Sequence, residues 1–403
     1  DRVQAWASTF LSPKRRWEPD PGGIGFVLRT RFVLVNAPEL LSVLRVNLDV
    51  VSTQEAGIKV PEVETHNIVA QISARQSEKM ENLAERVMAI RERDIDPKDD
   101  NILKIISEGR QLSLDPRLLD WSAAPADGEA GVLKWEMMAE NIHDIWEKES
   151  ASGATQIVFC DLGTPSAARK GGFNIYDAVR DTLVEKGVPA NEIAFIHEAK
   201  TDKAKGDLLA KVRAGAVRVI IGSTMKMGEG TNMQDKAVAI HHLDAPWRPS
   251  DIEQRDGRIV RQGNGHEKII RHIYTTKGVG FDEYTWTVLK TKAEAFAAIL
   301  RGEPGIRVFD NDIDPSYAET VAITTGNPLL IEKLDVEREI TRSRVLARGH
   351  DDEQWRLRMS LDGIKARLEE SEESLGRLRT LPKITNRSWS IDLSGFRSFA
   401  PES

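Results

Sequence analysis

The spacing of apolar residues divides the chain into strands and helices. Helical stretches near residues 174–186 and 205–213 alternate with short apolar runs typical of strands, at 156–160, 193–197, 217–223, 237–243 and 269–275. Such alternation indicates βαβ units, in which parallel strands form a sheet with helices on both faces. We therefore predict one α/β domain over residues 151–302.

A second pattern, at the start of the chain, predicts a strand and a helix. Apolar and polar side chains alternate along Phe26, Leu28, Thr30, Phe32 and Leu34, which is the period-two signature of a strand. The run PELLSVLRVNL then predicts a short helix that begins at a proline. No further strand-like run lies nearby, so residues 1–60 are interpreted as the remnant of a domain whose start is missing.

The stretch from 61 to 150 is interpreted as a linker that is mostly helical. An extended piece, VETHNIVAQIS, leads into a polar helix at about 74–93, and residues 101–130 are rich in turn formers and small residues. The run KWEMMAENIHDIWEK has apolar residues at helical spacing and predicts a further helix.

The C-terminal part, 303–403, is expected to be a helical extension. Asn327 and Pro328 fit the cap and first turn of a helix. Further along, apolar residues are spaced as in a short coiled-coil seam, with the acidic run EESEES on the solvated side: Ile364, Leu368, Leu375 and Leu378. A helical hairpin packed on its own domain is the alternative explanation.

Composition limits the classes of function. The 56 Lys and Arg residues are balanced by 63 Asp and Glu residues, giving a net charge of -7, so any nucleic-acid contact has to be local. The single cysteine, Cys160, cannot form a disulfide framework or a metal cage, which favours a reducing, cytoplasmic location. No run reaches the roughly 20 apolar residues that span a bilayer, so we expect a soluble protein. The start without methionine indicates a fragment.

The segment RPSDIEQRDGRIVRQGN carries the most informative chemistry. Ser250 followed by Glu253 has the spacing of a capping box, which predicts a helix starting at Asp251 and continuing for about a dozen residues. On such a helix, one amide and two guanidinium groups share a face, while Arg255 points to the side; the sharing residues are Gln254, Arg258 and Arg261. Paired guanidiniums bind polyphosphates well. Pairing with surface carboxylates such as Asp251 and Asp256 is the alternative.

These residues resemble known helicase motifs. QRDGRIVRQ is similar to motif VI of superfamily-two helicases, GSTMKMGEGTNMQ to motif V and QIVFCD to motif IV, in the order and spacing of that family. The resemblance implies a RecA-like fold. It is closer to Swi/Snf-like helicases, and closer still to the helicase part of large phage and mobile-element proteins that often carry an adenine-N6 DNA methyltransferase. The phrases LDAPWRPSDIEQRDGRIVRQGN and FDEYTWTVLKTKAEAF carry this closer match.

The resemblance also implies roles for individual residues. The two arginines of motif VI, Arg258 and Arg261, would be arginine fingers, which can be worth about 10³–10⁵ in rate. The positions implied to face ATP are Gln254, Gly228, Glu229, Gly230 and Asn232. Those implied to contact nucleic acid are Ser223, Thr224, Lys226 and Thr231. For the glycines alone, an ordinary turn is the alternative explanation.

Other motifs of the family are missing from this sequence. No G-K-T or G-K-S phosphate loop occurs, and no D-E-x-H-like acid pair for Mg²⁺. By the resemblance, ATP and Mg²⁺ would be held mainly by a first RecA-like motor domain of the same parent protein, of which residues 1–60 would be the remnant. We therefore expect the second half of an ATP-dependent DNA helicase or translocase, which completes an ATP site without forming one. The alternative is a non-catalytic nucleic-acid-binding or regulatory module.

Two further groups of residues are open to a functional or a structural interpretation. His241 and His242 are adjacent in a predicted strand, so they face opposite sides and cannot chelate one metal ion together, and no metal site is expected. The aromatic residues Trp247, Tyr284 and Trp286 can stack on bases or pack between helix and sheet. Packing is the interpretation favoured for both groups.

Overall fold

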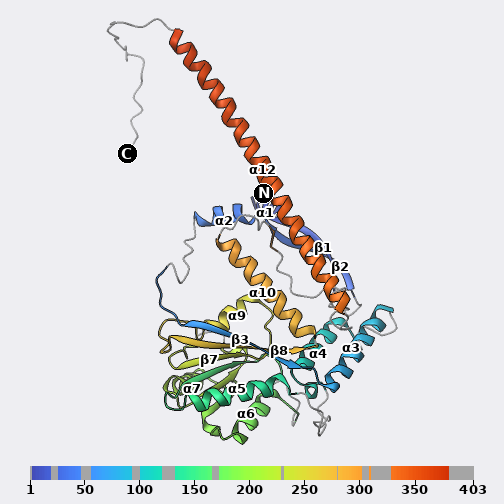
Figure 1. The fold of residues 1–403 in the computed structure, drawn as a ribbon, viewed down its shortest axis with the longest axis vertical. Helices are drawn as coiled ribbons and strands as arrows, with labels where there is room; N and C mark the ends of the chain where they lie inside the picture. Colours follow the sequence, from blue (N-terminus) through green and yellow to red (C-terminus); the bar gives the residue numbers. More distant parts are fainter. Residues whose placement is uncertain are drawn as a thin grey trace, which may run out of the picture. The chain divides into compact units, whose positions relative to one another are not determined.

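The centre of the fold is a six-stranded parallel sheet (Figure 1). The computed structural model describes residues 2–19, 26–46, 56–92, 100–119, 132–165, 172–227, 231–278, 280–301, 308–309 and 328–380. The sheet has the order β3-β8-β7-β4-β6-β5, and every neighbouring pair is parallel. Its strands are β3 (Glu62–Gln71), β4 (Thr155–Phe159), β5 (Ile193–Phe195), β6 (Val219–Gly222), β7 (Ala237–His242) and β8 (Lys268–Lys277). The predicted α/β fold class is confirmed.

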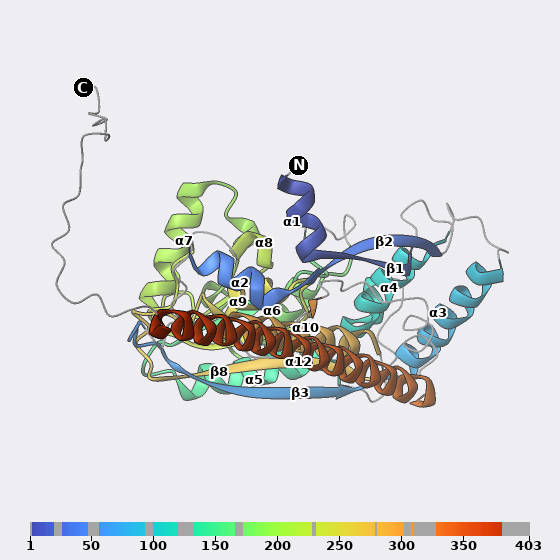
Figure 2. The same cartoon turned by 90° about the horizontal axis from the view of Figure 1, so that it is seen from above.

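The edge strand β3 lies upstream of the range predicted for the domain. It pairs with β8 over ten residues, from Glu62 opposite Lys268 to Gln71 opposite Lys277, and Figure 2 shows the two strands side by side. The sequence shows an extended piece here but places it in a linker, because its partner strand is about 200 residues away. Only the pairing in space assigns this strand to the sheet.

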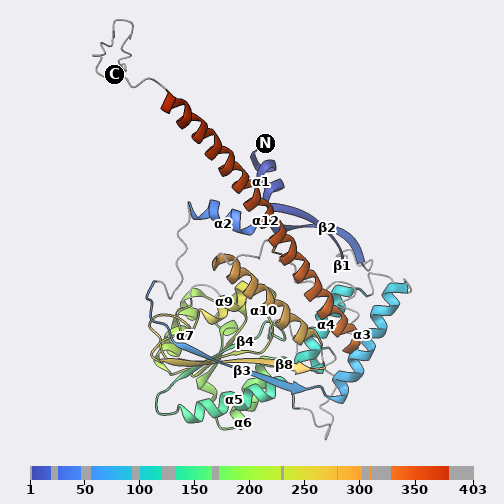
Figure 3. The same cartoon turned by 45° about the horizontal axis from the view of Figure 1, so that its top comes forward.

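Helices cover both faces of the sheet, as Figure 3 shows for α5 and α6 on one side and α9 and α10 on the other. Successive residues of β4 alternate between two apolar cores. Val158 and Cys160 pack with the core that contains α5 (Lys134–Lys148) and α6 (Ile175–Glu185). Ile157 and Phe159 pack with the core that contains α7 (Asp202–Ala214). Because both of their faces are buried, the inner strands β4, β6 and β7 are apolar at most positions.

A third apolar cluster joins helices before and after the sheet. It contains Met80, Leu83 and Val87 of α3 (Ala74–Glu92), residues of α4 (Ile102–Leu114) and Phe281 of α10 (Gly280–Arg301). Helix α4 corrects the prediction that 101–130 consists of turns and small residues. Apolar residues recur at helical spacing as far as Leu114, and Asn101 caps the helix by accepting a hydrogen bond from Lys104 N at 3.0 Å.

The N-terminal segment contains a partner strand that the sequence pattern does not reveal. The strands β1 (Leu11–Pro19) and β2 (Phe26–Val35) pair antiparallel, and β9 (Val308–Phe309) adds to β2. In the chain, β1 and β2 lie between α1 (Arg2–Phe10) and α2 (Ala37–Arg45), whereas β9 comes much later, after α10. The run LSPKRRWEP has too few apolar residues to show strand periodicity. The strand at 26–35 is thus confirmed, whereas the expected lack of a partner strand is wrong.

The remaining elements are short, with one exception. The short ones are α8 (Thr224–Met227), α9 (Pro249–Asp256) and the 3₁₀ turns η1 (Pro116–Leu118), η2 (Ala190–Glu192) and η3 (Ile196–Glu198). The exception is α12 (Pro328–Thr380), a continuous helix of 53 residues that confirms the predicted helical C-terminal extension. Among the helices of the described residues, none is long and apolar enough to cross a bilayer.

Candidate nucleotide and nucleic-acid site

The carboxyl ends of three neighbouring strands meet at one edge of the sheet. Strand β4 lies between β6 and β7. Asp161 follows β4, Thr224 follows β6 and Asp244 follows β7. The chain turns from one half of the sheet to the other between β6 and β7, and ligands of open α/β sheets bind at such switch points, beyond the carboxyl ends of the strands.

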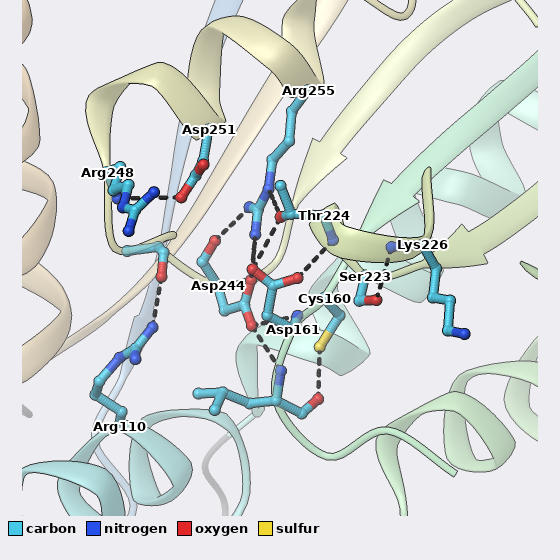
Figure 4. A network of polar contacts seen from close by, with 12 residues as sticks. Arg110, Cys160, Asp161, Ser223, Thr224, Lys226, Asp244, Arg248, Asp251 and Arg255 are labelled. Atoms are coloured by element: carbon cyan, nitrogen blue, oxygen red, sulfur yellow. Dashed lines mark hydrogen bonds and ion pairs between the residues drawn. The ribbon is translucent and has the colours of Figure 1, made fainter. Parts of the chain in front are cut away.

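Arg255 forms hydrogen bonds with all three of these strand ends (Figure 4). Its Nε donates to Thr224 Oγ1 at 2.7 Å, and its Nη1 donates to the Asp244 carbonyl oxygen at 2.8 Å. The remaining nitrogen, Nη2, lies 2.7 Å from Asp161 Oδ2 and 3.1 Å from Asp244 Oδ1. Every nitrogen of the guanidinium therefore has an acceptor, from three different strand ends.

The network is closed by hydrogen bonds among its own members. Asp244 Oδ2 accepts from the backbone N–H groups of Asp161 and Leu162, at 2.6 and 2.9 Å. Asp161 in turn accepts from Thr224 N at 2.6 Å and from Thr224 Oγ1 at 2.8 Å. The loops after β4 and β6 are thereby held in one arrangement.

Burial determines the electrostatics of this network. The side chain of Arg255 is fully buried, and that of Asp244 is nearly so. Burial, together with the neighbouring Asp161, raises the pKa of Asp244. Burial opposes the charge on Arg255, but Asp244 and Asp161 outweigh it, so the pKa of the guanidinium rises. A buried charge of this kind is tolerated only because its partners are within hydrogen-bonding distance.

The loop between β7 and α9 is fixed from the other side by Arg110 of α4. Its Nη2 donates to the Ala245 carbonyl oxygen at 2.6 Å, and its guanidinium carbon lies 4.1 Å from the centre of the Trp247 ring. The Arg110 side chain is buried, and this burial lowers its pKa. Helix α4 therefore positions the segment that leads into the arginine motif.

The start of α9 differs from the predicted capping box. The helix begins at Pro249, two residues before the predicted start, and Asp251 rather than Glu253 accepts a hydrogen bond from the chain before the helix, from Arg248 N at 3.2 Å. Proline is favoured at the first helical position because its fixed φ suits a helix and its missing N–H is not needed there. The prediction that Ser250 and Glu253 form the cap is wrong.

The end of α9 also overturns the predicted shared helical face. The helix stops at Asp256, and residues 257–260 continue as tight turns in which Arg258 N donates to the Arg255 carbonyl oxygen. Helical geometry therefore does not apply to Arg258 and Arg261. Each instead contacts the loop after β6: Arg258 Nη1 donates to Thr231 O at 3.3 Å, and Arg261 Nη1 donates to Asn232 Oδ1 at 2.8 Å.

The residues expected to contact nucleic acid differ in exposure. Ser223 is partly exposed and Lys226 is exposed; the backbone N–H of Lys226 donates to Ser223 Oγ at 3.4 Å. Thr224 is buried in the Arg255 network. Thr231 is fully buried, and its hydroxyl donates to the Met227 carbonyl oxygen at 2.6 Å. In this structure the two threonines stabilise the loop, whereas Ser223 and Lys226 face outward.

The residues expected to face ATP also differ in exposure. Gln254, Arg261 and Asn232 are exposed, and Arg258 is partly exposed. The glycine-rich positions Gly228, Glu229 and Gly230 lie outside the described residues. The described part of this surface therefore presents the guanidiniums of Arg258 and Arg261 beside residues 231–232.

The adjacent histidines face opposite sides of the sheet, as predicted. His241 Nδ1 lies 2.9 Å from Tyr274 Oη, and its Nε2 lies 3.0 Å from Gln156 Oε1. His242 Nε2 lies 3.0 Å from Asp256 Oδ1 at the end of α9. Both rings are fully buried, and burial lowers the pKa of each. The geometry rules out a shared metal ion between these two rings.

The three aromatic candidates fall into two groups. Trp286 packs edge-on against His242, and Tyr284 packs against the cluster of α3 and α4, so both fix α10 to the domain. Trp247 differs, because 45% of it is exposed while Arg110 covers one face of its ring. Packing between elements thus describes two of the three aromatic side chains.

Sequence patterns alone did not reveal Asp161 and Asp244 as parts of this site. They are 83 residues apart, and each is an ordinary acid after an apolar run. The available signal was positional: both directly follow predicted parallel strands, whose carboxyl ends lie at one edge of a sheet. Applying that rule to all strands would have placed them beside the helicase-like motifs.

A comparison with protein families gives this geometry a class. Residues 140–263 match the family described as the helicase conserved C-terminal domain. This range includes β4 to β7, α9 and both Arg258 and Arg261. The part of the sheet from β4 to β7 and its helices therefore match a helicase C-terminal domain, on an α/β fold with a parallel sheet.

One particular relative is a phage protein. Over 96 residues the chain is 38% identical to Defense against restriction protein B of Escherichia phage P1. The match covers 24% of this chain and 4% of the phage protein. The chain therefore corresponds to a small part of that relative's length.

The chain is also similar to parts of solved structures. The Sulfolobus solfataricus SWI2/SNF2 ATPase C-terminal domain is 18% identical, with a TM-score of 0.40, and the match covers 59% of this chain and 90% of that chain. The C-terminal part of the Fun30 ATPase domain is 14% identical, with a TM-score of 0.38, and covers 56% and 88% respectively. The class assignment rests on the sequence family and on the sheet itself.

Proposed function

We propose that this chain supplies the second motor domain of an ATP-dependent DNA helicase or translocase. In this proposal ATP binds between the described sheet and a first RecA-like domain of the same parent protein. One observation carries the proposal: Arg258 and Arg261 both lie against residues 231–232, directly after the glycine-rich segment 228–230. Two guanidiniums beside the loop after β6, next to a glycine-rich stretch of sequence and at the switch point of a parallel sheet, suit a polyphosphate.

Within this proposal the two arginines act as arginine fingers. They neutralise the charge that develops on the γ-phosphate during transfer, and the exposed Gln254 is proposed to contribute its amide. Arg255 does not take part in this step, because its guanidinium is fully buried and saturated by protein acceptors. Its role is to hold the strand ends that carry the glycine-rich loop.

Nucleic acid is assigned to the outward-facing side of the loop after β6. Lys226 is exposed there with the partly exposed Ser223, and the neighbouring Met225 is 88% exposed. A lysine and a hydroxyl can contact phosphate oxygens, which position a protein on a duplex without reading sequence. The choice of DNA follows from the resemblance to Swi/Snf-like helicases. The proposal of a linked adenine-N6 methyltransferase in the parent protein follows from the closer resemblance to large phage and mobile-element proteins.

The described residues fit a half-site for ATP rather than a complete one. Guanidinium groups are present for phosphate oxygens. Mg²⁺ needs oxygen ligands such as carboxylates. Across the described ranges, no group of three or more His, Cys, Asp or Glu side chains is arranged to hold a metal ion. The proposal assigns Mg²⁺ and the phosphate loop to the first motor domain, because the sequence contains neither a G-K-T or G-K-S motif nor a D-E-x-H-like acid pair.

ATP hydrolysis tests the proposal directly. The chain is assayed alone and as part of the parent protein with its first motor domain, with and without duplex DNA. We expect no turnover from the chain alone and DNA-stimulated turnover from the parent. In the parent, Arg258→Ala should lower kcat by about 10³-fold or more. The matched control is Arg377→Ala, which removes an exposed arginine of α12 that pairs with Glu373 of its own helix.

Each other outcome points to a different conclusion. Full activity of the Arg258→Ala parent would refute the arginine-finger role. DNA-stimulated turnover by the chain alone would mean that it holds an unrecognised phosphate-binding site. DNA binding without turnover, even in the parent, would favour the non-catalytic nucleic-acid-binding module.

A further inference from the structure

The C-terminal helix α12 carries a regular seam of apolar residues over its last turns. Within 357–378 the seam positions are separated alternately by four and three residues, which is the a/d pattern of a coiled coil. The residues at these positions are Leu357, Leu361, Ile364, Leu368, Ser371, Leu375 and Leu378. Only one of the seven seam positions is polar, over about three heptads.

The seam is uncovered in the structure of the single chain. Leu361, Ile364, Leu368 and Leu375 are each more than half exposed. A long helix in water is stabilised mainly by burying its apolar face, so an open stripe of leucines leaves this segment without that contribution. The seam therefore requires a partner with a matching apolar stripe.

Two glycines strengthen this requirement. Gly363 and Gly376 lie inside the helix but off the seam, and each has nothing within 4 Å of the position a Cβ atom would take. Glycine in a helix interior costs about 1 kcal/mol relative to alanine. A helix with two such positions needs compensation from packing along the seam, and the glycines do not obstruct that packing.

Charges beside the seam select the partner and its direction. In a parallel pair of identical helices, the g position of one copy faces the next e position of the other, so Arg367 faces Glu372 twice. In an antiparallel pair centred on the same seam, e positions face e positions. Lys365 then faces Glu372, but Arg358 faces Arg379, so attraction and repulsion cancel. The parallel arrangement between identical copies is favoured.

We propose that residues 357–378 form a parallel coiled coil with the same segment of a second copy of this chain. The heptad register, the exposed leucines and the complementary g and e charges support this assembly. It does not depend on the proposed motor function, since it involves only the C-terminal helix. Packing of the helix on its own domain and capture by a different protein are the competing outcomes.

The first test is the mass of the full chain in solution as a function of concentration, measured by sedimentation equilibrium. We expect a reversible dimer whose dissociation constant rises at least about 100-fold in Leu368→Glu, because each copy loses a buried leucine. Ala366→Glu is the matched control, since position 366 lies on the outer side of the helix. A monomer at every concentration, or equal weakening by both variants, would overturn the proposal.

The second test is the direction of the helices. Leu361→Cys and Leu375→Cys are made separately and oxidised; the native Cys160 is buried and serves as the background. In a parallel, in-register dimer both positions lie opposite themselves, so both variants should form disulfide-linked dimers. An antiparallel pair can bring at most one of them together. A disulfide-linked dimer from one variant only, or from neither, would overturn the parallel arrangement.

A charge exchange gives an independent measure of the same arrangement. Arg367→Glu should raise the dissociation constant by about 2- to 10-fold, and adding Glu372→Arg should restore the original value because the pair is re-formed with reversed signs. Failure of the double variant to recover affinity would contradict the facing of these two positions.

Discussion

Arg255 and Arg258 are three residues apart in one motif, yet their guanidinium groups lie in different environments. Arg255 is fully buried and bonded to Asp161, Asp244 and Thr224. Arg258 is partly exposed, and its Nη1 donates to a backbone carbonyl oxygen of the loop after β6. Arg261 is more exposed still and contacts Asn232. The helix end at Asp256 separates the buried arginine from the other two.

The difference teaches that residue type does not assign a role within such a motif. A guanidinium surrounded by protein acceptors contributes to the stability of the fold, because its partners would be left as uncompensated buried charges without it. A guanidinium beside an exposed loop can exchange a protein contact for a ligand. Stability and catalysis should therefore respond to different members of the same motif.

The largest expected effect is the loss of stability on Arg255→Ala. Removing the guanidinium leaves the buried Asp244 without its cation, which should lower the free energy of unfolding by about 3–5 kcal/mol. Urea denaturation followed by circular dichroism measures this change. The matched variant Arg258→Ala should cost less than about 1 kcal/mol. Equal losses in the two variants would remove the distinction between them.

Lowering the pH should destabilise the sheet through the buried His272, independently of Arg255 and Arg258. Burial, with His66 nearby, lowers the pKa of His272 from 6.5 to about 4. Between these values the unfolded chain binds more protons than the folded one, so stability falls as the pH drops through this window. The loss from His272 should reach about 3 kcal/mol near pH 4. Unfolding experiments from pH 7 to 4 measure it, and His272→Gln should flatten the dependence; an unchanged slope would contradict this assignment.

A smaller loss of stability is expected on removal of the Thr224 hydroxyl, which bridges Arg255 and Asp161. Thr224→Val removes the acceptor of Arg255 Nε and the donor to Asp161 Oδ2, leaving a buried donor unsatisfied. The free energy of unfolding should fall by about 1–3 kcal/mol. The neighbouring Ser223→Ala, at a partly exposed position, should stay within about 0.5 kcal/mol. Similar losses at the two positions would show that the network is not the cause.

The smallest stability effect is expected for Asn232→Ala. It removes the exposed contact with Arg261 Nη1, which should cost about 0.5 kcal/mol or less. Thermal unfolding of the variant beside the native chain measures this difference. A loss as large as that of Arg255→Ala would mean that the surface arginines also hold the fold together.

The fold class could be predicted because the signal is local. Apolar runs such as QIVFC and AVAIHH, separated by helical stretches, indicate buried parallel strands whatever their order in the sheet. The helicase-like motif around Arg258 is also readable, since its residues are close together in the chain. Strand β1 was missed because its polar composition hides the period, and α4 was missed because small residues follow it.

The sequence by itself determined the parallel α/β domain, the helical extension with its heptad seam, and the segment that carries the three arginines. Only the tertiary structure decided that β3 belongs to the sheet, that α9 ends before Arg258, and that Arg255 is buried against Asp161 and Asp244. The reason is the distance along the chain over which each kind of signal acts. Periodicity and motifs act over a few residues, whereas strand pairing and buried ion pairs join residues that are tens to hundreds of positions apart.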